Sequence, residues 1–535
     1  MKELVIFKIK STYSYDDVIE SQEAFKNLGS ENDTYDVNSL DEKGKVYIGH
    51  NNQNEPGWYD NVKMLATALD KDIKNQSSRA IAVLEVDNKV YILTFGHGRH
   101  MINEDYIVRN FGRKIVLNLI EADSIKTTQT AAIGDFITSH LSSSSRQTNL
   151  NDLRINTDSD LLLRIEGNIN ILNLKANAVG GDSIKLSFKE PIEVTLIVNI
   201  IRELEKQYNE DAYKEKFEWI DNLVPIKDKV LKDEIFKAAF KDFIKEDASL
   251  HLVNLDTTYD NYSYSFTEKG SRVEDINDLK SLITVGERIE EEEYINELTQ
   301  SLLKKKIFAH DNENGDILLW SLKKCLAGEV PGFDRTYTLF LGNIYEVNQD
   351  YVNTINEKVK SLQNDHNFEL DFDICDKKEE GDYLQEQAEN RDDIMCLDQD
   401  FITYNGRSIE ACDLLTDNKE LIHVKKWSSS STLSHLFQQG IVSAELLLND
   451  RYFREELNKK LNEEKFKIPE TNFQPPDYTI IYSVLFKAEN YTFVDLPIFS
   501  KIVLVNSFIT LRNLAFKVKL NSLRYIVEDK QKSEE

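Results

Sequence analysis

The chain has 535 residues, of which 41% are hydrophobic and 30% are charged, and at roughly 100 to 200 residues per domain this length predicts three or four domains. The composition excludes a disordered chain, a fibre and a disulfide-stapled mini-protein. The formal net charge of −28 excludes a protein that coats nucleic acid with a uniformly basic surface, so any nucleic-acid site must be local.

Cysteine usage and hydropathy favour a cytoplasmic protein without a membrane span. The four cysteines are far apart and include no CxxC pair, which fits a reducing compartment. The first apolar run, residues 4–7, is shorter than a signal peptide requires. The most apolar long window, residues 496–516, is interrupted by charged residues such as Lys501 and Arg512, which excludes a bilayer span.

The N-terminal part predicts an α+β domain over residues 1–140. Residues 2–10 alternate as a strand, and residues 15–28 have helical spacing after a Ser/Asp-rich start. Residues 140–151 are polar and Ser-rich, and we place the first domain boundary there.

A β-hairpin is the clearest local element of this domain. Residues 80–86 and 89–95 are strand-like and flank Asp87 and Asn88, a dipeptide suited to a two-residue turn with positive φ. The hairpin continues into the sequence Phe95-Gly-His-Gly-Arg. This segment lacks the lysine of a phosphate-binding loop and the third glycine of a dinucleotide fingerprint, so we expect a structural turn.

The rest of the chain divides into three predicted units. They are a mixed α+β to helical region over residues 151–305, a connecting region over 306–378 and a C-terminal unit over 379–530. From residue 405 to the end the sequence has 18 Lys and Arg against 18 Asp and Glu, so the whole excess of acid lies before it. The C-terminal unit is therefore the part best able to approach a polyanion.

The C-terminal unit predicts a helix, three strands, a helix and a strand, followed by a further helix and a closing strand. These elements cover, in order, residues 383–389, 394–397, 408–415, 420–427, 432–448, 478–486, 499–514 and 516–527.

The candidate chemistry lies in residues 409–427. An acid, Asp413, precedes a predicted hairpin turn, and a lysine, Lys425, follows it. Phosphodiester hydrolysis needs a divalent cation held by carboxylates, with a nearby lysine that positions or deprotonates water and stabilises the developing charge. Mg²⁺ prefers oxygen ligands and keeps several waters, so one or two carboxylates are sufficient. The segment therefore predicts a site for Mg²⁺ or Mn²⁺.

The length of the hairpin loop decides which side chains share a face of the sheet. A three-residue loop pairs Asp413 with His423 and puts Lys425 on the same face. A two-residue loop instead pairs Glu410 with Lys425, and a bulge would let both carboxylates contribute. Asp413 and Lys425 are our first candidates, Glu410 is the second and His423 the third.

This order of elements and the acid and lysine of the hairpin resemble the PD-(D/E)xK nuclease superfamily, which includes restriction enzymes and RecB-like nucleases. The resemblance covers residues 380–530 and implies a restriction-endonuclease-like mixed sheet flanked by helices, within a multidomain α/β and α+β chain. It implies Asp413 as the metal-binding acid and Lys425 as the catalytic lysine. His423 stands where the superfamily has an acid, and imidazole suits Mn²⁺ or Zn²⁺ better than Mg²⁺.

The resemblance implies two further parts of the site. Members of the superfamily often use an acid from the helix before the first strand, which here offers Glu386 or Glu389. RecB-like nucleases carry a helix glutamine near the lysine, and Gln438 or Gln439 has that place, with Gln439 preferred. A Ser/Thr cluster over residues 428–432 starts this helix and is suited to bind phosphate.

At the level of the whole chain, several phrases resemble one uncharacterised, sporadically distributed bacterial family of chains of roughly 500 residues. The phrases begin at Phe95 (FGHGR), Asn110 (NFG), Ile409 (IEACDLL), Ile422 (IHVK) and Leu433 (LSHLFQQG). Patchy distribution is typical of mobile defence cassettes.

We therefore expect a cytoplasmic, Mg²⁺- or Mn²⁺-dependent endonuclease or exonuclease of a bacterial anti-phage or restriction-like system, with DNA favoured as the partner. The N-terminal two thirds would serve as a sensor, specificity or assembly module, as a homo-oligomer or with a companion defence protein. Two alternatives stay open: a nucleic-acid-binding protein whose nuclease-like core has lost hydrolysis, and an RNase.

Overall fold

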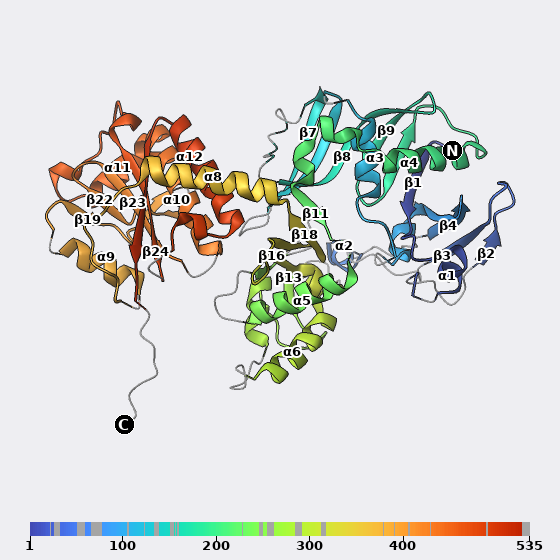
Figure 1. Ribbon diagram of the computed structural model, residues 1–535, viewed down its shortest axis with the longest axis horizontal. Helices are drawn as coiled ribbons and strands as arrows, with labels where there is room; N and C mark the ends of the chain where they lie inside the picture. The colour runs from blue at the N-terminus through green and yellow to red at the C-terminus, as the bar shows by residue number, and fades with distance from the viewer. Residues whose placement is uncertain are drawn as a thin grey trace.

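The fold is known from a computed structural model, in which several sheets and helices form a multidomain α+β chain (Figure 1). It describes residues 1–21, 23–25, 33–50, 59–65, 78–103, 106–121, 123–132, 138–149, 153, 155, 157, 160–226, 228–244, 250–253, 262–283, 291–311, 317–377, 379–389, 391–404, 407–427, 430–487 and 491–526. None of the helices in these ranges is long and apolar enough to cross a bilayer.

A ten-stranded antiparallel sheet dominates the N-terminal part, in the order β2-β3-β4-β5-β1-β10-β9-β8-β6-β7. Its strands are β1 (Glu3–Lys8), β2 (Asp33–Asp36), β3 (Gly44–His50), β4 (Ser78–Val86), β5 (Lys89–Gly96), β6 (Ile125–Ala132), β7 (Thr138–Thr148), β8 (Asp160–Ile171), β9 (Leu174–Gly180) and β10 (Ile184–Phe188). The helices of this part are α1 (Tyr15–Glu20), α2 (Tyr59–Leu65), α3 (Phe111–Leu119) and α4 (Leu196–Asn209).

The predicted hairpin around Asp87 and Asn88 is confirmed. Val86 pairs with Lys89, and the two turn residues have φ values of 49° and 59°. The Ser-rich segment that we took for a boundary overlaps most of strand β7, which pairs with β6 in this sheet. Composition alone therefore predicts the hairpin turn correctly and does not predict β7.

Gly98 explains the phrase that follows the hairpin. A Cβ at this position would lie 2.2 Å from the carbonyl oxygen of Ala80, so only glycine permits the close approach of this turn to β4. The turn continues as a short 3-10 helix, η1 (Gly98–Met101). These contacts agree with the structural turn expected from the sequence.

Two smaller sheets and the α-helices α5, α6 and α7 form the middle of the described chain, and most of their buried apolar residues belong to one cluster. The five-stranded sheet has the order β11-β18-β17-β16-β12 and the other sheet the order β13-β14-β15. Their elements are β11 (Leu223–Pro225), α5 (Lys229–Ile244), β12 (Leu250–Leu252), β13 (Tyr262–Ser265), α6 (Glu292–Lys304), β14 (Lys306–Asp311), β15 (Ile317–Ser321), α7 (Leu322–Cys325), β16 (Leu326–Val330), β17 (Tyr337–Phe340) and β18 (Asn343–Val347).

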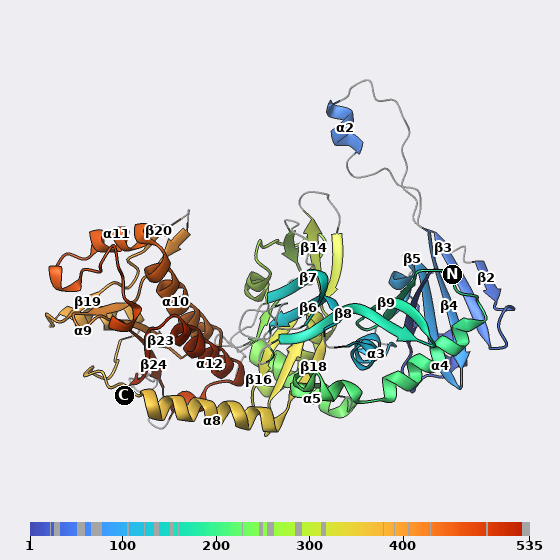
Figure 2. The same cartoon turned by 90° about the horizontal axis from the view of Figure 1, so that it is seen from above.

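A single helix, α8 (Gln349–His366), leads from this middle part to the C-terminal part (Figure 2). The side chain of Asn348 caps its first turn by accepting hydrogen bonds from the backbone N–H groups of Asp350 and Tyr351. Val352, Ile355 and Val359 are buried in the same cluster as the core of the C-terminal part. The helix is thus packed into the C-terminal part.

The C-terminal sheet has the order β19-β22-β23-β24-β25. Strands β19, β22 and β23 pair antiparallel, whereas β23, β24 and β25 pair parallel. The elements are α9 (Glu380–Glu389), β19 (Ile394–Cys396), β20 (Ile402–Tyr404), β21 (Arg407–Ile409), β22 (Leu414–Thr416), β23 (Glu420–Lys426), α10 (Ser430–Asn449), α11 (Arg451–Lys460), β24 (Thr479–Phe486), α12 (Ile498–Asn513) and β25 (Lys517–Arg524).

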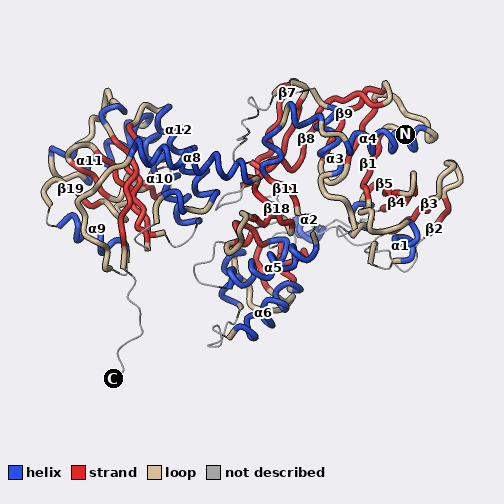
Figure 3. The backbone as a smooth tube through the Cα atoms, viewed as in Figure 1, coloured by secondary structure: helices blue, strands red, loops and turns tan. Residues whose placement is uncertain are grey.

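Most predicted elements of this part are present within a few residues, and one is corrected. The single strand predicted over residues 408–415 is two strands, β21 and β22, which belong to different sheets. Figure 3 shows the strands of this part in the middle, with helices around them. Helices α10 and α12 pack on one face of the sheet, and α9 packs on the other.

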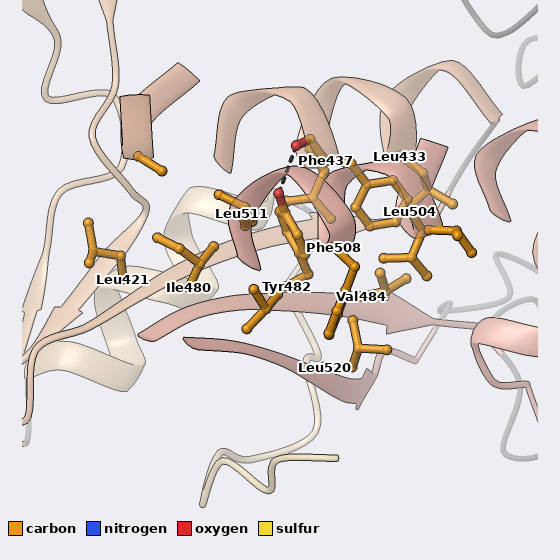
Figure 4. Packing of buried hydrophobic residues seen from close by; sticks show 14 of the residues in the cluster. Leu421, Leu433, Phe437, Ile480, Tyr482, Val484, Leu504, Phe508, Leu511 and Leu520 are labelled. Carbon is orange, nitrogen blue, oxygen red and sulfur yellow. Dashed lines mark hydrogen bonds between the residues drawn. The ribbon is translucent and has the colours of Figure 1, made fainter. Parts of the chain in front are cut away.

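Strand β24 is apolar on both faces because helices cover both. Its Tyr482 is fully buried, and the Tyr482 hydroxyl donates a 2.8 Å hydrogen bond to the carbonyl oxygen of Phe437 in α10 (Figure 4). A Cβ at Gly440 would lie 2.4 Å from this hydroxyl oxygen. Glycine at 440 therefore lets α10 approach the sheet, and this fixes the helix that borders the candidate site.

Candidate functional site

The hairpin of β22 and β23 has the register of a three-residue loop. Leu414 pairs with Ile422 and Leu415 with Leu421, which places Asp413 opposite His423. Lys419 has a φ of 64°, the left-handed residue that such a loop requires. The alternative two-residue register, which would pair Glu410 with Lys425, is therefore wrong.

Three carboxylates nevertheless meet beside this hairpin. Asp398, Glu410 and Asp413 each offer an oxygen, and these oxygens lie within 4.8 Å of one another. Asp398 comes from the connection between β19 and β20, Glu410 follows β21, and Asp413 precedes β22. The chain leaves β21 after residue 409 and enters β22 at residue 414, and this connection brings Glu410 next to Asp413. The bulge considered from the sequence would likewise have let both carboxylates contribute.

Backbone and side-chain donors hold two of these carboxylates. Asp413 is 5% exposed, and its Oδ2 accepts a 2.6 Å hydrogen bond from the backbone N–H of Val424. Glu410 Oε1 accepts from the backbone N–H of Gln399 at 2.5 Å, and Glu410 Oε2 accepts from Gln439 Nε2 at 3.3 Å. Gln439, singled out from the sequence, therefore lies against Glu410.

Lys425 is held by an acid of α9. Its Nζ lies 2.7 Å from Oε1 of Glu380, and Oε2 of Glu380 accepts a 2.6 Å hydrogen bond from the backbone N–H of Lys426. The sequence instead offered Glu386 or Glu389 as the acid that this helix contributes to the metal site. Glu386 is 48% exposed and pairs with Lys377 at 3.2 Å, so it is not part of the site.

The helix begins three residues earlier than predicted, at Glu380, and this accounts for the difference. Gly381 follows, and a Cβ there would lie 2.5 Å from Oδ2 of Asp398. Glycine at 381 therefore allows the Asp398 carboxylate to rest against the first turn of α9. Glu380 and Asp398 are the two residues of the site that sequence reasoning missed.

His423 lies opposite Asp413 in the hairpin register, and its ring is buried against an aromatic side chain. It is 2% exposed, its ring centroid lies 6.1 Å from that of Tyr482, and its Nε2 has no hydrogen-bond partner among the residues that the structure describes. Burial lowers the pKa of His423 to about 4, so the ring is neutral near pH 7. Among the described residues, the group able to hold a metal does not include His423, so we correct its third place in the predicted site.

Burial and mutual repulsion raise the pKa values of the three carboxylates. Burial, and then the charge of Glu410, raises the pKa of Asp413 well above its usual range, although the Val424 N–H opposes this. Burial also raises the pKa values of Glu410 and Asp398, with other acids of the site adding to the effect. Carboxylate oxygens that repel one another suit a hard divalent cation such as Mg²⁺ or Mn²⁺.

Lys425 keeps its proton in this setting. Burial alone would lower the pKa of Lys425, but the charge of Glu380 and their hydrogen bond outweigh it and raise the pKa. The ammonium group therefore stays charged near neutral pH. The Ser/Thr cluster proposed to bind phosphate lies at the start of α10, where Ser428, Ser429 and the side chains of residues 430–432 are outside the described part.

Fold and site together define a multidomain α+β protein with a partly buried acidic group and a lysine beside a mixed C-terminal sheet. Residues 4–523 match a family of unknown function, DUF6119, and the chain belongs to this family. This confirms the uncharacterised family expected from the sequence phrases. A comparison with curated proteins finds no match.

Proposed function

We propose that the C-terminal part of the chain is a metal-dependent nuclease that hydrolyses phosphodiester bonds, with DNA as its favoured substrate. The observation that carries the proposal is the meeting of Asp398, Glu410 and Asp413 beside a hairpin that also bears Lys425. The order α9, β19, β22, β23, α10, β24 adds support, since it resembles the helix, three strands, helix and strand of PD-(D/E)xK nucleases.

The three carboxylates would hold Mg²⁺ or Mn²⁺. His423 stands where PD-(D/E)xK nucleases have an acid, and Asp398 would take the place of that acid. Asp398 reaches the same spot from another loop and brings the oxygen ligand that the histidine does not. A divalent cation bound there would stabilise negative charge on a phosphate oxygen and lower the pKa of a bound water.

The chain's own residues would then act around the substrate. Lys425, charged and held by Glu380, would stabilise the negative charge that develops on the phosphate as the attacking water adds. Its raised pKa favours this role over that of a general base. Gln439 would keep the carboxylate of Glu410 aimed into the site.

The test is cleavage of linear, supercoiled and single-stranded DNA, and of RNA, by the purified full chain with Mg²⁺, Mn²⁺ or EDTA. We expect metal-dependent cleavage that falls at least about 100-fold in Asp413→Asn and in Lys425→Met. Lys459→Met is the matched control, because Lys459 is exposed and pairs only with Glu456 in its own helix among the contacts described. Cleavage that persists unchanged in both site variants would refute the proposal.

A second candidate is a nucleic-acid-binding protein that has lost hydrolysis, and the buried, unligating His423 is the observation that favours it. Binding by the wild-type chain without cleavage under any metal condition would select it. An RNase would cleave only the RNA substrates of the same assay.

The biological setting belongs to the same proposal. Resemblance to a patchily distributed bacterial family favours an anti-phage or restriction-like role for this cytoplasmic protein, in which the N-terminal two thirds sense or select the target. Protection of a bacterial host from phage by the wild-type gene, lost with Asp413→Asn, is the expected result.

A further inference from the structure

The carboxyl ends of the three parallel strands β23, β24 and β25 meet at one edge of the C-terminal sheet. Lys426 pairs with Leu485, and the backbone N–H of Trp427 donates to the Leu485 carbonyl oxygen at 3.0 Å. On the other side, Tyr525 N–H donates to the carbonyl oxygen of Phe486 at 3.1 Å. Ligands of sheets with parallel strands bind outside such carboxyl ends.

Aromatic rings gather at this edge. The ring centroid of Trp427 lies 5.3 Å from that of Tyr491 and 5.8 Å from that of Phe486, both edge to face. Phe486 is buried and supports the cluster, whereas Tyr491 is 46% exposed. The hydroxyl of Tyr525 donates to the Trp427 carbonyl oxygen at 3.4 Å. The cluster therefore offers aromatic surface to solvent on a rigid base.

Cations lie on the other face of this edge, the face to which Tyr525 belongs, whereas Trp427 and Phe486 belong to the face covered by α10 and α12. Lys426 Nζ lies 5.5 Å from the ring centroid of Tyr525 and donates to the carbonyl oxygen of Lys377 at 2.7 Å. Lys487 is exposed and follows β24 directly. The nearby acid Glu380 is engaged by Lys425. In a chain with a net charge of −28, this edge thus combines positive charge with aromatic surface.

We infer that this edge, which we call the aromatic ledge (Lys426, Trp427, Tyr491 and Tyr525), binds a single-stranded segment of nucleic acid. Bases would stack on Tyr491 and Trp427 on one face of the edge, while Lys426 would contact phosphates where the nucleic acid crosses the edge toward the other face. Duplex DNA is disfavoured as the ligand because its bases already stack on one another and present no free face. The inference rests on the proposed nuclease function and names its substrate form.

The position of the ledge along the chain supports this assignment. Trp427 follows Lys425 by two residues and comes directly after the end of β23, a separation of about 7 Å in an extended chain. A single strand of nucleic acid whose bases stack on the aromatic ledge would therefore bring a neighbouring phosphate toward Lys425 and the three carboxylates. An aromatic ring beside the proposed catalytic lysine would stack on a base and so keep the nucleotide at the cleaved bond unstacked from its neighbours.

The test measures binding of a labelled single strand of roughly 12 nucleotides, and of its duplex, to the full chain by fluorescence anisotropy in EDTA. We expect tighter binding of the single strand, weakened roughly 5- to 100-fold by Tyr491→Ala and retained by Tyr491→Phe. Tyr452→Ala removes a similarly exposed tyrosine of α11 and serves as the control. Unchanged binding in Tyr491→Ala, or no preference for the single strand, would overturn the inference.

A second measurement covers Trp427, whose substitution also disturbs packing. Quenching of tryptophan fluorescence by the oligonucleotide should be reduced in Trp427→Phe, which keeps an aromatic ring at the position. Because EDTA prevents cleavage, the two proposals can fail separately. Cleavage that depends on Asp413, together with binding that does not depend on Tyr491, would support the nuclease function and refute binding at the aromatic ledge. Binding that depends on Tyr491, without any cleavage, would support binding at the ledge and refute the nuclease function.

Discussion

Replacing Asp413 by asparagine should stabilise the metal-free protein and remove its response to divalent cations. Asp413 is 5% exposed, and it shares the site with Asp398 and Glu410, whose oxygens lie within 4.8 Å. Asparagine has nearly the same shape, and its carbonyl oxygen can still accept the hydrogen bond from the N–H of Val424. The substitution therefore removes charge with little change in packing.

The size of the effect follows from the spacing of the carboxylates. Two full charges 4.8 Å apart repel by about 3.5 kcal/mol at an effective dielectric constant near 20. Proton uptake and solvent relaxation reduce this figure, so we expect Asp413→Asn to raise the free energy of unfolding by roughly 1 to 3 kcal/mol without metal. For a cooperative unit of 150 to 250 residues, each kcal/mol shifts Tm by about 2 to 4 °C.

The pH dependence has a definite sign. The pKa of Asp413 is raised in the folded chain, because burial and neighbouring acids disfavour its ionised form. The folded state therefore binds more protons than the unfolded state above the ordinary carboxyl pKa of about 4. The stability of the wild-type chain falls as pH rises through this range, so the advantage of Asp413→Asn should be small near about pH 4 and larger at about pH 8.

Thermal unfolding in EDTA, and then in Mn²⁺ or Mg²⁺, provides the assay. A cation present at 100 times its Kd stabilises the wild-type protein by about 2.7 kcal/mol, and the variant should gain much less. Asp382→Asn is a suitable control, since it removes one acid from the first turn of α9 outside the metal-ligand group. A wild-type Tm that divalent cations leave unchanged, together with no gain for Asp413→Asn in EDTA, would refute the reasoning.

Three further substitutions test how the site is built. Gly381→Ala should displace Asp398, whose Oδ2 would lie 2.5 Å from the new Cβ, at a cost of roughly 1 to 3 kcal/mol, and should shrink the Tm gain from Mn²⁺. Glu380→Gln should lower the pKa of Lys425, because burial then acts without the opposing charge, and the alkaline limb of the cleavage profile should move to lower pH. Tyr482→Phe should cost about 1 kcal/mol in urea unfolding through loss of a buried hydrogen bond, with m unchanged.

The parts of the fold that the sequence predicts are those set by local rules. The turn at Asp87 and Asn88 needs residues that tolerate positive φ, and the chain supplies them there. The run of apolar residues in β24 and the helical spacing of α10 follow directly from burial on the sheet. The Ser-rich strand β7 has no such signal, because its place depends on pairing with β6 and not on its own composition.

The candidate site divides in the same way. Asp413 and Lys425 share a hairpin, so their proximity follows from pairing within one short segment. Asp398 reaches them by tertiary structure alone: Gln399, with a φ of 59°, turns the chain there, and its backbone N–H donates to Glu410. A non-glycine residue at positive φ beside a buried acid stores strain that the surrounding contacts must offset.

That strain supports a functional reason for the position of Asp398. A loop free to relax would place its carboxylate in water, where the pKa would be ordinary and no repulsion from Glu410 would arise. Instead, the loop is fixed by Lys460, which pairs with Asp400, and by Tyr404, whose hydroxyl donates to Asp450 at 2.5 Å. Holding three acids together thus lowers the stability of the fold, and in the proposed site a bound divalent cation would offset this cost.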